Sequence, residues 1–109
     1  MSYEIVLLDR FDGEFKKLIK KLNKSTQAKI LREIDLLEEF GKDLGMPYSK
    51  KIDNLLWELR SSGKERIRIF YSIKDKKIYL LSCFLKKSQK SPKKELGKAK
   101  ERLKNIYHV

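Results

Sequence analysis

The chain has 109 residues, of which 40% are hydrophobic and 39% are charged, and its formal net charge is +12. This length suits a single domain, residues 1–109, with one hydrophobic core, and the apolar content excludes an intrinsically disordered chain. One cysteine and one histidine exclude a disulfide framework and an ordinary zinc site, so no metal or other cofactor is expected. No apolar run approaches the roughly 18 residues of a membrane span, and no charged leader precedes an apolar segment. We therefore expect a soluble cytoplasmic protein without a membrane partner.

The first half of the chain predicts one strand followed by a helical hairpin. Residues 3–8 form a short apolar run, which is typical of a strand. Apolar residues then recur at helical spacing over residues 11–22 and again over residues 30–40. Ser25 is a suitable N-cap for the second helix, and Gly41 or Gly45 is suited to end it.

The second half changes to a period of two and predicts three strands. Apolar side chains alternate with polar ones over residues 55–60 and 66–73, and residues 78–85 form a further apolar run. Turn-forming residues separate the three runs, so consecutive strands form hairpins. Ser91 as N-cap and Pro92 at the first helical position then start a C-terminal helix. The order βααβββα predicts an α+β fold, in which helices cover one face of an antiparallel sheet and the C-terminal helix is basic.

The positive charge is concentrated in the second half of the chain. Residues 1–54 contain eleven Lys and Arg against ten Asp and Glu, whereas residues 55–109 contain sixteen against five. Such segregation is typical of a protein that binds nucleic acid or another polyanion. A lysine-rich surface that reflects an AT-rich genome is the alternative. It does not explain why acidic residues nearly balance the basic residues in the first half of the chain alone.

The predicted sheet brings basic side chains to one place. The two central strands each have a face that points away from the predicted core, and these faces carry Glu58, Arg60, Arg66 and Arg68. A run of lysines begins where the third strand of the meander ends and continues into the last helix. Arginine offers a bidentate fork to phosphate and lysine a mobile point charge, so we expect a strongly positive surface here. The alternative is a cross-strand ion pair between Glu58 and Arg66 or Arg68. The lysines in this run are Lys86, Lys87, Lys90, Lys93 and Lys94.

Three segments together resemble one protein family. Residues 56–60 read LWELR, residues 68–71 read RIFY and residues 84–92 read FLKKSQKSP, followed by Glu95, Ala99 and Arg102. At this spacing they resemble the HigB-like, phage-derived branch of the RelE/ParE toxin superfamily, and the resemblance covers almost the whole chain. It implies a RelE-like fold and the toxin half of a type II toxin–antitoxin pair. Many members cleave messenger RNA, often on the ribosome, and are neutralised by a helix-turn-helix (HigA-like) antitoxin.

The activity that the resemblance implies is metal-independent cleavage, in which a ribose 2′-hydroxyl attacks the adjacent phosphate. As a hypothesis, Arg60, Arg68, Lys86 and Lys87 are the catalytic residues that clamp this phosphate. Glu58, Arg66, Lys90, Lys93 and Lys94 are the expected RNA-binding residues. The general base stays open between the clustered lysines 86, 87 and 90, which lower one another's affinity for protons, and Glu58.

The aromatic residues and the overall function each allow more than one interpretation. Tyr48, Phe70 and Tyr107 are candidate platforms on which RNA bases stack, although a structural role is the alternative for each. The competing functions are a ParE-like toxin that acts on DNA gyrase and a non-enzymatic module that binds RNA or DNA. A gyrase inhibitor would not need residues that clamp a phosphate, and a binding module would produce no RNA fragments.

Overall fold

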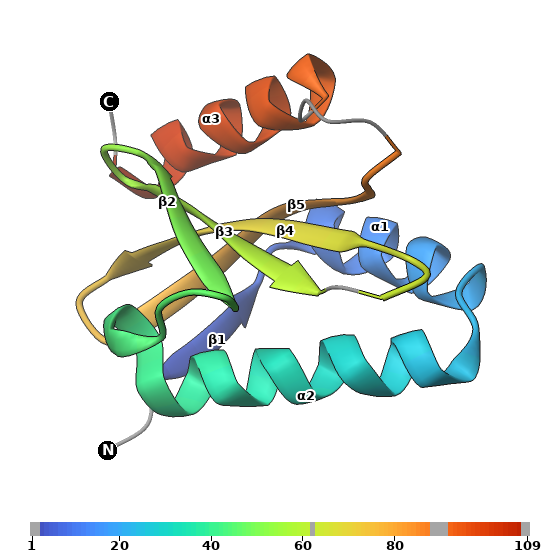
Figure 1. Cartoon of the computed structure of the whole chain (residues 1–109). Coiled ribbons are helices and arrows are strands. Elements are labelled where there is room, and N and C mark those ends of the chain that lie inside the picture. Colours follow the sequence, from blue (N-terminus) through green and yellow to red (C-terminus); the bar gives the residue numbers. More distant parts are fainter. Residues whose placement is uncertain (1–2, 62, 88–91, 108–109) are drawn as a thin grey trace.

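The computed structural model describes residues 3–61, 63–87 and 92–107 and has an α+β architecture, as the sequence predicts. None of its described helices is both long and apolar enough to cross a membrane. Figure 1 shows the elements in chain order. They are β1 (Glu4–Leu7), α1 (Asp9–Lys20), α2 (Lys24–Phe40), the short 3₁₀ helix η1 (Gly41–Asp43), β2 (Ser49–Asp53), β3 (Leu56–Ser61), β4 (Ile67–Lys74), β5 (Lys77–Leu85) and α3 (Lys93–Tyr107).

The described strands form one sheet in the order β1-β5-β4-β3-β2. The central strands β3, β4 and β5 are the predicted antiparallel meander. Two features differ from the prediction, because β2 is an additional strand antiparallel to β3 and β1 pairs in parallel with β5. β2 has the sequence SKKID and lies mostly exposed at the sheet edge, so it lacks the apolar alternation by which strands are recognised.

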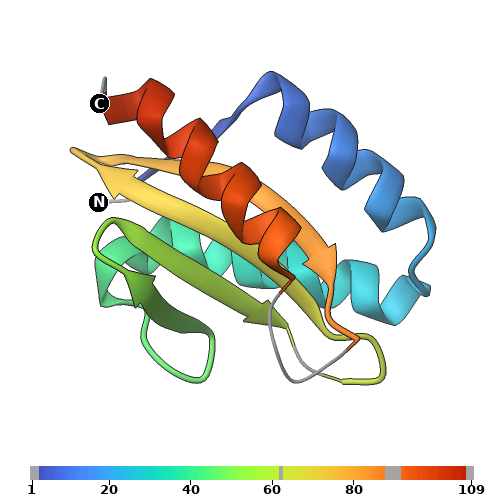
Figure 2. The same cartoon turned by 90° about the horizontal axis from the view of Figure 1, so that it is seen from above.

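Helices cover both faces of the sheet rather than one, which corrects the prediction. On one face, Phe11 of α1 and Ile30 and Leu37 of α2 are fully buried against inward-facing residues of the central strands. On the other face, α3 packs its buried Ala99 against a second apolar cluster (Figures 1 and 2). That cluster contains Leu56, Phe70, Leu81 and Phe84.

An irregularity in β5 helps to build the second cluster. Phe70 pairs with Ser82, but the next residue of β4, Tyr71, pairs with Leu80, so Leu81 is an extra residue in β5. Leu81 packs in the second apolar cluster, beneath α3, and the Ser82 hydroxyl donates to the Glu95 carbonyl of α3 at 3.1 Å. A β-bulge of this kind turns two consecutive side chains towards the same layer and so enlarges the surface on which α3 rests.

The N-terminus of α2 is capped by a side chain, and its C-terminus is capped by a glycine. Asn23, not Ser25, is the N-cap, and its side chain accepts a hydrogen bond from the Thr26 N–H at 2.9 Å. The helix ends at Gly41, which has a φ of 53°. A side chain at this position would collide with the Tyr3 ring, so glycine satisfies both the backbone and the packing.

Arg102 ties α3 to α1 across the middle of β5. Its guanidinium makes two hydrogen bonds of 2.8 Å to the Glu14 carboxylate and one of 2.7 Å to the Leu81 carbonyl. Its side chain is only 11% exposed. The hydrogen bond from Arg102 is the main cause that lowers the pKa of Glu14 in the folded chain.

We expect Glu14→Gln to lower the free energy of unfolding at pH 7 by about 2 kcal/mol, since it removes a charge-assisted bidentate pair. A carboxylate whose pKa is lowered stabilises the fold above its ordinary value of 4.5, and this contribution is lost as the pH falls through the lowered value. Urea unfolding at several pH values checks both statements, with the exposed Glu101→Gln as the matched control. A deficit that persists unchanged in strong acid would contradict the role of this pair.

Candidate nucleic-acid interface

The ends of three strands bring the predicted basic residues together. β3 ends, β4 begins and β5 ends at the same end of the sheet, close to the first turn of α3 (Figure 2). Arg60 lies opposite Arg68 across β3 and β4, and the Lys86 N–H donates to the Arg66 carbonyl at 2.8 Å. We call Arg60, Arg66, Arg68, Lys86 and Lys87 the basic strand end.

Glu58 lies at the centre of this group. Its Oε1 is 3.8 Å from Nε of Arg60 and 4.0 Å from Nε of Arg68. The Glu58 and Arg68 side chains are 4% and 3% exposed, whereas that of Arg60 is 27% exposed. One buried carboxylate therefore lies between two guanidinium groups, and within this trio Arg60 is the residue that extends towards solvent.

Arg68 is anchored by the backbone as well as by Glu58. Its Nη1 donates to the carbonyls of Ser61 and Ile67, each at 3.0 Å. Burial lowers the pKa of the Arg68 guanidinium and the Glu58 carboxylate opposes this effect, while the charges of Arg60 and Arg66 act in the same direction as burial. Direct contact with a phosphate would require Arg68 to leave these partners, so its surroundings favour a positioning role.

The remaining predicted residues differ in exposure. Arg66 and Lys86 are half-buried, whereas Lys87 is exposed where the chain leaves β5. Lys93 and Lys94 are exposed in the first turn of α3. Lys90, the predicted N-cap Ser91 and the single histidine of the chain, His108, lie outside the described residues.

The sequence does not single out Lys50, and it leaves Tyr48 as one of three aromatic candidates. Lys50 pairs with Glu58 across β2 and β3, and the Arg60 N–H donates to the Tyr48 carbonyl at 2.7 Å. Paired residues share a face of the sheet, so β2 extends the basic strand end by one strand. The spacing of Tyr48 and Lys50, two residues apart, was the available signal, but it carries weight only once β2 is recognised as a strand.

The three aromatic candidates separate clearly in the structure. Phe70 is fully buried beneath α3, so the hypothesis that it is a stacking platform is wrong. The Tyr107 hydroxyl donates to the Ile73 carbonyl at 3.0 Å, and Lys74 Nζ lies 5.2 Å from its ring centroid. Tyr48 is 39% exposed, which leaves it available to a ligand.

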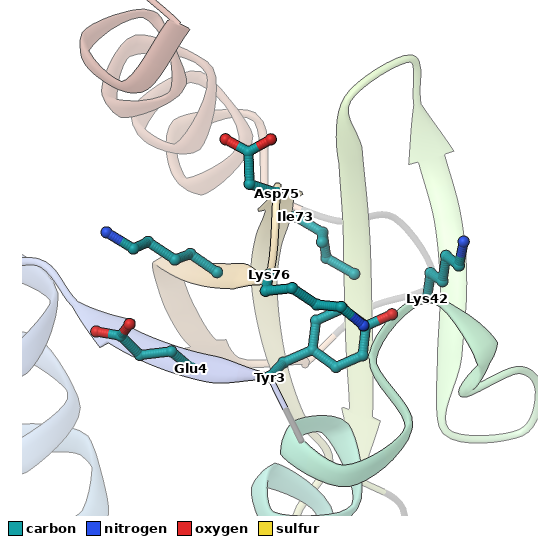
Figure 3. Close-up of a pocket in the computed structure, with 7 residues that line it drawn as sticks. Tyr3, Glu4, Lys42, Ile73, Asp75 and Lys76 are labelled. Atoms are coloured by element: carbon teal, nitrogen blue, oxygen red, sulfur yellow. The ribbon is translucent and has the colours of Figure 1, made fainter. Parts of the chain in front are cut away.

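A separate hollow lies at the opposite end of the sheet, beside the β4–β5 turn. Figure 3 shows Lys76 reaching across the Tyr3 ring, and its Nζ is 4.5 Å from the ring centroid. The hollow has a volume of about 870 Å³, and its lining mixes lysines with two carboxylates, so it is less suited to a polyanion than the basic strand end. The lining residues are Tyr3, Glu4, Lys42, Ile73, Asp75, Lys76 and Lys77.

No metal centre emerges from the side chains in the described ranges. Among these residues, no three His, Cys, Asp or Glu side chains are placed to hold one ion. Cys83 is 8% exposed, and burial is the main cause that raises the pKa of its thiol to about 12. This thiol is a buried structural group rather than a reactive one.

Comparison with solved structures identifies the fold. The structure is similar to that of a mutant of the E. coli toxin RelE in the free state, with a TM-score of 0.65 and 13% sequence identity over 94% of this chain and 99% of that chain. It is also similar to an archaeal RelE from Pyrococcus horikoshii that was solved in complex with RelB, with a TM-score of 0.51 and 20% identity over 78% of this chain and 96% of that chain. The chain therefore has the RelE-like fold that its sequence predicts.

The family follows from a sequence match. Residues 17–104 match the family described as phage derived protein Gp49-like (DUF891), and the chain belongs to this family. No curated protein matches the chain at the sequence level. The family match confirms the resemblance to the phage-derived branch that the three sequence segments indicate.

Proposed function

We propose that this chain is the toxin of a type II toxin–antitoxin pair and that it cleaves messenger RNA, most readily on the ribosome. The observation that carries the proposal is the basic strand end, where the more exposed Arg60 lies 3.8 Å from Glu58 of the buried Glu58–Arg68 pair and where Lys86 and Lys87 follow the end of β5. Burying a charged pair is costly for a small domain. Here the buried Glu58–Arg68 pair provides a fixed carboxylate next to the accessible guanidinium of Arg60. The RelE-like fold and membership of the Gp49-like family support the toxin assignment.

The proposed reaction needs three groups. A base removes the proton of a ribose 2′-hydroxyl, whose oxygen then attacks the adjacent phosphorus. Arg60, Lys86 and Lys87 stabilise the extra negative charge that develops on the phosphate oxygens, while the buried Arg68 positions Glu58 and, through it, Arg60. The bond from phosphorus to the 5′ oxygen breaks, and an acid protonates the departing oxygen. The products are a 2′,3′-cyclic phosphate and a 5′-hydroxyl.

The other basic residues bind the RNA strand on either side of this phosphate. Arg66 belongs to the basic strand end, Lys93 and Lys94 lie in the first turn of α3, and Lys50 extends the basic strand end along β2. Lys90 belongs to the same proposed set on sequence grounds. Among the candidate bases, the clustered lysines are favoured over Glu58, because the Glu58 carboxylate is buried between two arginines.

The proposed partner is a cognate helix-turn-helix antitoxin of the HigA type, acting in the cytoplasm. The P. horikoshii RelE was solved together with RelB, which supports a partner for a chain of this fold. A net charge of +12 favours an inhibitor that is acidic where it touches the toxin.

The chemistry of the RNA ends tests the proposed reaction. Messenger RNA incubated with the purified protein in a translating extract is expected to yield fragments with 5′-hydroxyl ends. Such ends accept an adaptor in a ligation only after a kinase has phosphorylated them. Fragments that carry 5′-phosphates would contradict attack by the 2′-hydroxyl, and unchanged messenger RNA would contradict the proposed function itself.

A further inference from the structure

Tyr48 is held beside Arg60 by the pairing of β2 with β3. Ser49 pairs with Leu59, and the pairing extends one residue further, where the Arg60 N–H donates to the Tyr48 carbonyl at 2.7 Å. Residues opposite each other in an antiparallel pair project from the same face of the sheet. Tyr48 is therefore the residue opposite Arg60, at the edge of the basic strand end.

The Tyr48 ring is not used by the core. It is 39% exposed, and among the described residues its hydroxyl has no hydrogen-bond partner, whereas Tyr71 is 1% exposed and its hydroxyl bonds that of Ser49. The backbone at Tyr48 is nonetheless fixed, because the N–H groups of Tyr48 and Ser49 both donate to the Gly45 carbonyl, at 3.1 and 3.2 Å. An exposed aromatic ring on a fixed backbone loses little conformational freedom when a ligand binds.

Met46 is a second exposed apolar side chain, close to the positive charge of Arg60. It is 63% exposed, and its Sδ lies 4.0 Å from Nη1 of Arg60. A flat ring, a polarisable thioether and an adjacent guanidinium suit a ligand with an apolar planar part joined to an anion. An unpaired nucleotide of single-stranded RNA is such a ligand, because its base can stack on the Tyr48 ring and its phosphate can bind the Arg60 guanidinium.

We propose that the Tyr48 ring, flanked by Met46, is the platform on which one unpaired RNA base stacks while Arg60 binds the neighbouring phosphate. This inference rests on the proposed function and adds a base-contacting residue to it. Tyr48 and Met46 thereby become candidate determinants of sequence preference, because purines offer a larger stacking surface than pyrimidines.

The test measures binding without cleavage. A short single-stranded 2′-O-methyl RNA lacks the attacking hydroxyl, and one position at a time is made abasic. Fluorescence anisotropy is expected to show that Tyr48→Ala weakens binding about tenfold, as does loss of one particular base. The two changes together should weaken binding no further than either alone, because both remove the same contact. Tyr48→Phe should bind like the unchanged protein, since stacking uses the ring and not the hydroxyl.

Two controls separate a lost platform from a disturbed fold. Phe40→Ala removes another exposed aromatic ring, 46% exposed at the end of α2 in the other layer, and should leave binding unchanged. Tyr48→Leu keeps apolar bulk but has no ring face, so it should bind as weakly as Tyr48→Ala while its thermal unfolding stays close to that of the unchanged protein.

The outcomes that overturn the platform are distinct from those that overturn the proposed function. If Tyr48→Ala binds RNA normally, the platform is wrong even where the protein cleaves messenger RNA. The same holds if Tyr48→Ala weakens the binding of every abasic RNA by the same factor as it weakens the binding of the intact RNA. If Tyr48→Ala causes no further loss of binding to the RNA that is abasic at one position, but no RNA is cleaved, the platform stands and the nuclease assignment fails. Normal RNA binding by Tyr48→Ala with weakened antitoxin binding would make this surface a protein interface and would overturn the inference.

Discussion

Arg60→Ala is expected to lower the rate of messenger RNA cleavage about a hundredfold or more, with little change in the free energy of unfolding. Arg60 is the exposed member of the Glu58 trio and is therefore the guanidinium best placed to meet a phosphate. Removing one preorganised donor to a developing oxyanion costs a factor of this size in other enzymes. Cleavage is measured by primer extension in a translating extract, and stability by urea unfolding.

Two variants define what Arg60 contributes. Arg60→Lys keeps the charge but loses the planar fork, so it should recover only part of the rate. Arg32→Ala removes an arginine that is exposed on α2 in the opposite layer, and it should cleave at the unchanged rate. A rate for Arg60→Ala equal to that of Arg32→Ala would remove Arg60 from the site.

Arg68→Ala is expected to have the largest effect on stability, lowering the free energy of unfolding by about 3 kcal/mol or more. The substitution leaves the buried Glu58 without its closest buried cation and takes the donor from the carbonyls of Ser61 and Ile67. Cleavage falls as well, because Glu58 no longer has a fixed position from which to hold Arg60. Chemical unfolding measures the first effect, and cleavage by the fraction that remains folded measures the second.

A double-mutant cycle separates this positioning role from a catalytic one. The double variant Glu58→Gln/Arg68→Met should lose less free energy of unfolding than the two single variants lose together. Each single change leaves one buried charge without its partner, whereas the double change leaves no such charge. If Arg68→Ala abolishes cleavage while stability is unchanged, Arg68 contacts the RNA directly and the positioning role is wrong.

Much of the fold follows from periodicity, and the failures have identifiable causes. The alternation of Ile67, Ile69 and Tyr71 predicts the central strand and the face it buries, and the structure confirms both. The parallel pairing of Ile5 with Ile78 joins residues far apart in the sequence, and no local pattern encodes it. β2 escaped recognition because an exposed edge strand needs no apolar face.

The sequence predicts that the residues of the candidate site lie together, but it does not predict that two of them are buried. Hairpin connections alone place Arg60, Arg68 and Lys86 at the same end of the meander, and the register confirms that arrangement. The burial of Glu58 and Arg68 depends on their packing within the sheet, whose second face was expected to be open to solvent. Phe70 was the overlooked signal, because a large aromatic side chain on that face indicates a covering element.

The most direct test of the central claim is a cell-free translation reaction with the purified protein, in which the reporter messenger RNA is mapped by primer extension. New 5′ ends are expected with the unchanged protein and with Arg32→Ala, and they should disappear with Arg60→Ala and with a Lys86/Lys87 double alanine variant. Repeating the reaction on the same RNA without ribosomes shows whether cleavage depends on them. Intact messenger RNA in the presence of folded protein would contradict the claim that the basic strand end is a nuclease site.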